Sequence, residues 1–410
     1  MKVKVVSVLI VVIIFFNSLT IFANLEEDEE NFNIDKIKEE VIETTNNITD
    51  SPKVNSRIAL VYDRASGRIL FERNGNKHTP MASTTKIMTA IVVAENSNLS
   101  DVVTIDAKSA NTGGSRLGLK KNDKITVNDL LYGLMLRSGN DAAVALATHV
   151  GGSIEGFAKL MNDKAAELSL VNTHFVVPHG LDMNGHYTTA YELAKMADYA
   201  LNNEKIREIV STKTYMVYIN NKPKVISNTN ELLGNLYGVY GVKTGFTNGA
   251  GRCLVTACKR DNLDIITVII GADTKKIRTA DSIKLIEYTF KNFTIIDVKK
   301  QIQEQFENWK RLNEGRIIVN KGKKDNVKLR LQDIKCDKMA IKNTKIDNIK
   351  IEINCIYYLE APIDKGRIIG NVKVILDEET IDILQIYNEE EIERKDICSY
   401  LLEFLKCASI

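Results

Sequence analysis

One segment, 87–93, constrains the fold of this 410-residue chain more than any other. Apart from Thr89 it is apolar on almost every side, as expected of a helix that runs through a protein core. Ser83 and Lys86 stand three residues apart at its start, so one helical turn brings both side chains onto one face. The N-terminal end of this helix is therefore expected to open into a site, where free N–H groups favour an anion.

A serine and a lysine in this arrangement fit nucleophilic catalysis. The hydroxyl of Ser83 becomes a good nucleophile only when a base takes its proton. Lys86 can be that base if burial or a second cation keeps part of it neutral. The same spacing also fits a capping serine beside a lysine with an exposed ammonium group, so other parts of the chain must decide between the two interpretations.

A second polar motif, Ser138-Gly-Asn140, lies between the apolar segments 130–136 and 142–149, each predicted to be a helix. Thr126 is expected to cap the first of these helices. Polar side chains between buried helices are costly unless they are hydrogen-bonded. The motif therefore fits either a turn with a cap or a pair of groups aimed into a site.

A third motif, Lys243-Thr-Gly245, precedes two β-branched runs, 252–257 and 264–270, that predict adjacent antiparallel strands. The segments 57–62 and 69–72 predict a hairpin nearer the N-terminus. A glycine within a strand allows another backbone to approach closely, here that of a substrate, or marks a bulge.

These three motifs, in this order, are the combination found in β-lactamases and penicillin-binding proteins. The chain closely resembles the D-alanyl-D-alanine carboxypeptidases among the low-molecular-weight penicillin-binding proteins. The segments that carry the resemblance are 82–89, 134–146, 172–182, 186–190 and 242–247. The resemblance covers residues 54–292. It implies an α+β, β-lactamase/transpeptidase-like catalytic domain, an antiparallel sheet flanked by helices, followed by a small all-β domain.

The family implies a serine-type carboxypeptidase that removes the terminal D-Ala from peptidoglycan stem pentapeptides and is acylated by β-lactam antibiotics. Ser83 would be the nucleophile and Lys86 the general base, with Lys243 nearby favouring neutral Lys86. Ser138 would relay a proton to the leaving amine. Asn140 would hold the peptide amide.

The remaining contacts implied by the family lie along the strand of the third motif. The backbone N–H groups of Ser83 and Phe246 would hold the oxyanion. Thr244 would meet the terminal carboxylate of the substrate, and Gly245 would leave room for the substrate backbone. These positions make the strand the expected substrate-binding edge.

A carboxypeptidase must recognise a carboxylate, and a guanidinium is its natural bidentate partner. The family places this arginine after a strand ending in glycine, which favours Arg278 here. Arg252 and Arg260 are competitors nearer the third motif.

Two alternative functions remain to be compared. A class A β-lactamase would need a Glu-x-x-x-Asn loop between the second and third motifs. The only such spacing runs from Glu231 to Asn235, just before Lys243, which is too late in the chain and disfavours a β-lactamase. A non-catalytic binding protein would be expected to lack one of Ser83, Lys86 or Lys243. All three residues are present, which favours the carboxypeptidase.

The N-terminus predicts export. Basic residues, an apolar run over 5–16 and small residues up to Ala23 follow the order of a secretory signal over 1–23, and an uncleaved anchor is the alternative. Residues 24–53 are expected to form an acidic, polar linker. The protein is thus expected at the cell wall or the outer face of the cytoplasmic membrane. A net charge of +2 gives no support for nucleic-acid binding.

Alternating apolar and polar residues after residue 293 predict a β domain over 293–392 with a spacer or partner-binding role. The tail, 393–410, places apolar residues on one helical face, which favours either contact with a membrane surface or packing against the β domain.

No cofactor or metal is expected. The six cysteines show no Cys-x-x-Cys spacing. Cys253 and Cys258 should point to opposite faces of a strand and stay unpaired with each other. His174, His179 and His186 lack a metal-binding helix pattern, so they are expected to hydrogen-bond a loop.

Overall fold

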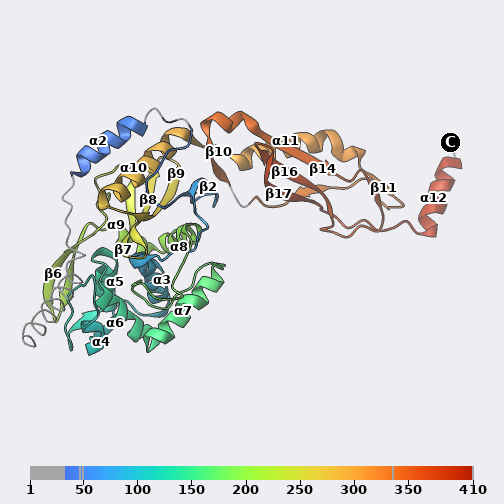
Figure 1. Ribbon diagram of the computed structural model, residues 1–410. Coiled ribbons are helices and arrows are strands. Elements are labelled where there is room, and N and C mark those ends of the chain that lie inside the picture. The colour runs from blue at the N-terminus through green and yellow to red at the C-terminus, as the bar shows by residue number, and fades with distance from the viewer. Residues whose placement is uncertain (1–32, 46–47, 49, 335–336, 409–410) are drawn as a thin grey trace, which may run out of the picture. The chain divides into compact units, whose positions relative to one another are not determined.

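The computed structural model describes residues 33–45, 48, 50–334 and 337–408 (Figure 1). The chain divides into two compact units, an N-terminal unit from Met1 to Lys291 and a C-terminal unit from Asn292 to Ile410.

A five-stranded antiparallel sheet forms the centre of the N-terminal unit, in the order β2-β1-β9-β8-β7. Its strands are β1 (Ile58–Asp63), β2 (Ile69–Arg73), β7 (Val239–Thr247), β8 (Gly251–Arg260) and β9 (Leu263–Ala272). The β1–β2 hairpin and the β8–β9 pair confirm the two strand predictions made from sequence. β7 is an edge strand, so one side of its backbone is not paired within the sheet.

Helices flank this sheet, and α3 (Lys86–Asn96) is among the most buried of them. Every residue of α3 from Lys86 to Val93 is buried, which confirms the core helix expected from its apolar pattern. The other helices are α4 (Ala107–Ala110), α5 (Val127–Leu136), α6 (Asn140–Gly151), α7 (Ile154–Glu167), α8 (Ala190–Asn202), α9 (Glu204–Ser211) and α10 (Lys275–Asn292). α8 lies against β1 and β9, and α9 lies against β7.

Local signals explain where helices begin. The hydroxyl of Thr126 accepts a hydrogen bond from the N–H of Asp129 at the start of α5, as expected, and Ser153 caps α7 in the same way. The unit also contains two small antiparallel strand pairs. They pair β3 (Val102–Thr104) with β4 (Lys124–Thr126), and β5 (Thr214–Ile219) with β6 (Lys222–Ser227).

The segment expected to be an acidic, polar linker contains a helix, α2 (Ile34–Thr45), that was not predicted from the sequence. Ile37 and Val41, four residues apart, are buried on one face of α2, and the side chain of Lys38 donates to the carbonyl oxygen of Asn235. Packing of this apolar face stabilises the helix in spite of its polar composition. The signal sequence expected over 1–23 lies outside the described residues.

The C-terminal unit contains the predicted β structure. Its main sheet is antiparallel, in the order β12-β17-β16-β14, and two short strand pairs and a long helix, α11, accompany it. The strands of this sheet are β12 (Leu329–Leu331), β14 (Ile349–Cys355), β16 (Ile368–Leu376) and β17 (Glu379–Asn388). The two separate pairs join β10 (Phe293–Asp297) to β13 (Lys338–Lys342) and β11 (Ile318–Asn320) to β15 (Tyr358–Glu360). The helices are α11 (Val298–Asn313) and α12 (Ile397–Ala408). Val298, Ile302 and Phe306 of α11 pack into its core.

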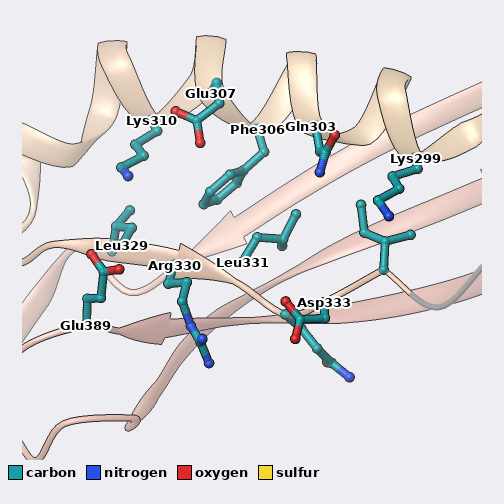
Figure 2. A pocket seen from close by; sticks show the side chains of 12 residues that line it. Lys299, Gln303, Phe306, Glu307, Lys310, Leu329, Arg330, Leu331, Asp333 and Glu389 are labelled. Carbon is teal, nitrogen blue, oxygen red and sulfur yellow. The ribbon is translucent and has the colours of Figure 1, made fainter. Parts of the chain in front are cut away.

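A groove of about 450 Å³ lies between α11 and the edge strand β12 (Figure 2). Figure 2 shows Phe306 directed from the helix toward the strand that carries Leu329 and Leu331. The charged residues along the groove have both signs, so it presents no field of one sign to a ligand. They are Lys299, Glu307, Lys310, Arg330, Asp333 and Glu389.

The last described helix, α12, exposes its apolar side chains. Ile397, Leu401 and Phe404 are 80%, 56% and 71% exposed, respectively. The alternative that these side chains pack against the β domain is therefore wrong. Among the helices that the structure describes, none is long and apolar enough to span a membrane.

Candidate active site

Ser83 lies in a short 3-10 helix, η1 (Ala82–Thr85), directly before α3. Ala82 has a φ of +47°, in the left-handed region that residues with a side chain seldom adopt. Gly180 packs tightly on this turn, because a Cβ there would lie 1.9 Å from the carbonyl oxygen of Ala82. The turn therefore depends on Gly180, and it presents the partly exposed Ser83 at the start of α3.

Lys86 is fully buried behind Ser83, and its Nζ atom lies within hydrogen-bonding distance of oxygens from three other residues. Nζ lies 2.9 Å from Ser83 Oγ, 2.7 Å from Asn140 Oδ1 and 2.7 Å from the carbonyl oxygen of His179. A neutral lysine amine has two N–H donors, which the two carbonyl oxygens can accept, and its lone pair then faces Ser83. In that state the hydroxyl of Ser83 donates to the amine and can lose its proton to it.

The Ser138-Gly-Asn140 motif follows α5 and ends at Asn140, the first residue of α6, whose side chain contacts Lys86. Asn140 accepts from Lys86 through Oδ1 and donates to the carbonyl oxygen of Gly113 through Nδ2, at 2.7 Å each. Ser138 has a φ of +58° and is 6% exposed. Its hydroxyl has no hydrogen-bond partner among the described residues. A buried hydroxyl without a partner is costly, and the cost is removed when a ligand bonds to it.

The third motif lies on β7, next to the turn that carries Ser83. Lys243 is 1% exposed and donates to the carbonyl oxygen of Thr244 at 2.9 Å. A Cβ on Gly245 would lie 3.0 Å from the backbone nitrogen of Ser83. The chain's own turn therefore makes a close backbone approach at Gly245, and the predicted contact of this glycine with a substrate stays a prediction. Thr244 Oγ1 lies 2.7 Å from Thr229 Oγ1.

Two cations lie close together at this end of the site. Burial and then the positive charge of Arg278 lower the pKa of Lys243 to about 7. Arg278, in the first turns of α10, is 5% exposed and forms an ion pair with Glu231, which also accepts from the hydroxyl of Thr279. Arg278 Nε is buried without a partner among the described residues. Arg278 therefore lies near Lys243 and keeps a donor for a further acceptor.

The two competing arginines differ in position. Arg252 stands opposite Phe246 in the β7–β8 register, with its guanidinium 3.9 Å from the centre of the phenyl ring. Arg260 forms an ion pair with Glu287 of α10 and also donates to the carbonyl oxygen of Tyr237. Arg252 thus flanks the site, whereas Arg260 is held elsewhere by Glu287.

The histidines support the loop behind Ser83. Burial lowers the pKa of His186 to about 4, so the ring is neutral. His186 Nδ1 accepts from the N–H of Val176, which leaves Nε2–H to donate to Thr85 Oγ1 at 2.9 Å. Thr85 in turn donates to the carbonyl oxygen of Ala82. This chain of bonds confirms the expected loop-bonding role for His186.

His179 and His174 also bond within this loop. Burial and then the charge of Lys86 lower the pKa of His179 to about 3, and its Nδ1 accepts from the N–H of Leu181. His174 Nδ1 lies 2.6 Å from the carbonyl oxygen of Gly185. Within the described parts of the chain, no group of three or more His, Cys, Asp or Glu side chains is arranged to hold a metal ion.

Sequence reasoning missed two aspartates next to the motifs. Asp141, fully buried, accepts hydrogen bonds from the N–H groups of three successive residues, 117–119, at 2.8 to 2.9 Å. Asp182 accepts from Thr247 Oγ1 at 2.6 Å and from the N–H of Gly249 at 2.9 Å. Asp141 directly follows the second motif, and this adjacency was the available signal. Asp182 had no local signal, because its partners lie 65 and 67 residues away.

A family model described as D-alanyl-D-alanine carboxypeptidase matches residues 45–274. The chain belongs to the D-alanyl-D-alanine carboxypeptidase family. A second model, the C-terminal domain of penicillin-binding protein 5, matches residues 306–394. These matches confirm the resemblance and the α+β fold followed by a β domain, and they identify this family member as a serine peptidase.

Relatives and solved structures agree with this membership of the carboxypeptidase family. The D-alanyl-D-alanine carboxypeptidase DacF of Bacillus subtilis is 32% identical over 84% of this chain and 88% of that protein. The corresponding enzyme DacC of Escherichia coli is 30% identical over 87% and 89%. A crystal structure of penicillin-binding protein 5 from Haemophilus influenzae aligns with a TM-score of 0.69 and 29% identity, covering 84% of this chain and 99% of that one.

Proposed function

We propose that this serine D-alanyl-D-alanine carboxypeptidase removes the terminal D-Ala of peptidoglycan stem pentapeptides through an acyl-enzyme on Ser83. The observation that carries the proposal is the contact of buried Lys86 with Ser83, because it places a basic group 2.9 Å from the hydroxyl oxygen whose proton must be removed.

In the acylation step, Ser83 Oγ attacks the carbonyl carbon of the penultimate D-Ala while its proton passes to Lys86 Nζ. A tetrahedral intermediate forms, and its oxyanion accepts from the backbone N–H groups of Ser83 and Phe246. The carbon–nitrogen bond then breaks. Ser138, whose hydroxyl has no partner within the described chain, relays a proton to the leaving amine of the terminal D-Ala.

In the deacylation step, a water molecule attacks the ester carbonyl and gives a proton to Lys86 Nζ, which returns a proton to Ser83 Oγ as the ester bond breaks. The bond to Ser83 breaks, which releases the shortened peptide and restores the hydroxyl. Asn140 holds the peptide amide next to Lys86, to which it is already bonded.

Recognition of the terminal carboxylate falls to the middle of β7, which carries Lys243 and Thr244. Arg278 supports this proposal, because it is a buried cation near Lys243 whose Nε has no partner among the residues that the structure describes. Glu231 already neutralises part of its charge, so the substrate carboxylate competes for the guanidinium with an internal anion. Arg252 is the alternative partner.

The test is intact-protein mass spectrometry with a D-Ala-D-Ala peptide and, separately, with penicillin, on the wild type and Ser83→Ala. The proposal expects D-Ala release and a long-lived penicillin adduct, both lost in Ser83→Ala. Rapid loss of the adduct without D-Ala release would instead support a β-lactamase. A stable adduct without peptide turnover would leave a non-catalytic binding protein, and no adduct would contradict the assignment of Ser83.

We further propose that the protein is exported, with a signal over 1–23, a catalytic domain over 54–292 and a β domain over 293–392 that acts as a spacer. The tail, 393–410, then contacts the membrane surface through α12, whose exposed apolar side chains support this role. Flotation of the mature protein with anionic vesicles tests the tail. Replacing Leu401 and Phe404 by Glu should abolish flotation, and unchanged flotation would contradict the proposal.

A further inference from the structure

A hollow of about 300 Å³ lies beside the site, and none of the proposed catalytic steps uses it. Its lining residues come from three separate segments of the N-terminal unit. They are Pro80, Asp182, Met183, Asn184 and Gly249. Pro80 stands three residues before Ser83, and Gly249 stands three residues after Phe246, so the hollow adjoins both the nucleophile and the substrate-binding edge.

The proposed contacts fix the direction of a substrate along β7. The terminal carboxylate lies at Thr244 and the scissile carbonyl at the N–H of Phe246. An extended peptide and a strand both advance about 3.3 Å per residue, so the preceding substrate residue continues toward Thr247 and beyond. In a stem pentapeptide this preceding residue is the third. Its side chain therefore projects at the end of β7 where Asp182 is bonded to Thr247 and Gly249.

The chemistry of the hollow suits a cation on an apolar stem. The Asp182 side chain is exposed, and its two bonds with the chain leave acceptor positions on both oxygens. Among the described residues, no Lys, Arg or His side chain lies within 4.0 Å of Asp182. Met183 is 51% exposed beside it and offers an apolar surface for methylene groups. The nearby cation Arg57 instead donates to the carbonyl oxygens of Gly249 and Ala250.

We propose that Asp182 and the hollow around it bind the free side-chain amine of a diamino acid at the third position of the stem peptide. The inference rests on the proposed carboxypeptidase function and adds a substrate specificity to it. The ammonium group pairs with the Asp182 carboxylate, and the methylene groups before it contact Met183 and Pro80. The shared chemistry is a primary amine, whether the third residue is lysine or diaminopimelic acid.

The first measurement needs only the wild-type protein. It compares kcat/KM for D-Ala release from Nα-acetyl-lysyl-D-Ala-D-Ala with that from the same peptide acetylated on its side-chain amine. The free amine should be preferred roughly fivefold, mainly through KM, as expected for one partly exposed ion pair. The preference should shrink at high salt because salt screens exposed charges. A ratio of one, or a preference for the acetylated peptide, overturns the inference.

Variants then locate the preference. In Asp182→Asn the ratio should fall to about one, whereas Asp163→Asn, which changes an exposed acid on α7, should keep the wild-type ratio. Asn184→Lys places a cation at the rim and leaves the bonds of Asp182 intact, so it should also lower the ratio and serves if Asp182→Asn does not fold. An unchanged ratio in both Asp182→Asn and Asn184→Lys contradicts the role of Asp182. The same pair of peptides is then made with diaminopimelic acid in place of lysine. The diamino acid that gives the larger ratio of kcat/KM between the free and the acetylated peptide is the preferred source of the amine.

Penicillin acylation separates this inference from the proposed function. Penicillin has no third-residue amine, so its adduct on Ser83 reports only the catalytic groups. If the wild type forms the adduct and releases D-Ala without distinguishing the two peptides, the specificity is wrong and the function stands. If neither the adduct nor D-Ala release is seen, the proposed function itself fails.

Discussion

The two units of the molecule treat charged side chains in opposite ways. The N-terminal unit buries Lys86, Lys243, Asp141 and Arg278 within or next to its site. In the described part of the C-terminal unit, Asn388 is the single buried polar side chain, and the ion pairs lie at the surface. Burial of a charge costs several kcal/mol unless it is paired and hydrogen-bonded.

The difference shows where the fold accepts a cost in stability. Each buried charge of the N-terminal unit has specific partners, as Asp141 has with three backbone N–H groups. Neighbouring cations and burial also change the pKa values of its basic groups, which nucleophilic chemistry by serine and lysine requires. The described part of the C-terminal unit has no such arrangement, and this fits a supporting role. Substitutions of charged side chains should therefore change stability or the pH dependence of acylation strongly in the N-terminal unit, and should change stability little in the C-terminal unit.

The largest effect is expected at Asp141. Asp141→Ala leaves three N–H groups of the 117–119 loop without their acceptor, which should lower the free energy of unfolding by about 4 kcal/mol. Asp141→Asn keeps one acceptor oxygen and should cost less. Urea unfolding of both variants measures the difference. Equal and small effects in the two variants would show that the buried carboxylate is not what holds the loop.

Acidification should also destabilise the N-terminal unit. The pKa of His186 falls from 6.5 to about 4 on burial, so the unfolded chain binds the proton first as the pH drops. The contribution of His186 to the free energy of unfolding is fully present above pH 6.5. It decreases by about 3 kcal/mol as the pH falls toward 4 and below. His186→Gln should flatten that part of the stability profile. A profile with the wild-type slope in the variant would exclude His186 as its source.

A smaller effect is expected from Arg278 on the pH dependence of acylation. Its positive charge is the second cause, after burial, of the low pKa of Lys243, so Arg278→Gln should move that pKa upward from about 7. Lys243 then stays protonated to higher pH. The midpoint near pH 7 in the rate of penicillin acylation should rise by about one unit or less, since burial remains.

Arg260→Gln is the matched control for this change, because Arg260 is also an ion-paired arginine but forms its ion pair with Glu287. It should leave the midpoint in place. A midpoint that moves equally in both variants would mean that the shift is not a local effect of Arg278 on Lys243.

Much of the fold and the three motifs could be predicted from sequence because their signals are local. The apolar pattern of α3, the cap at Thr126 and the β-branched runs of β8 and β9 each lie within one element. The position of β9 between β1 and β8 could not be predicted, because pairing of distant strands leaves no mark in local periodicity. α2 was missed although Ile37 and Val41 carry a helical spacing, since its neighbours are polar.

Within the site, residue types were predictable and their partners were not. Gly245 signalled a close backbone approach, but the sequence could not show that Ser83 makes it. Arg278 was expected to be available to a substrate, whereas Glu231, 47 residues earlier, pairs with it. Such partners are brought together by the packing of β7 and α10, which depends on the whole N-terminal unit.

The smallest effect is expected at Glu390, in the C-terminal unit. Hydrogen bonds with Lys324 and Lys328 lower the pKa of Glu390 to about 2, yet the two lysines are exposed and Glu390 is partly exposed. Exposed ion pairs contribute little, so Glu390→Gln should lower the Tm of the protein by at most about 2 °C. The difference should vanish in high salt, where screening removes the interaction. A loss of stability as large as that of Asp141→Ala would contradict the contrast between the units, because it would mean that a surface ion pair matters as much as a buried carboxylate.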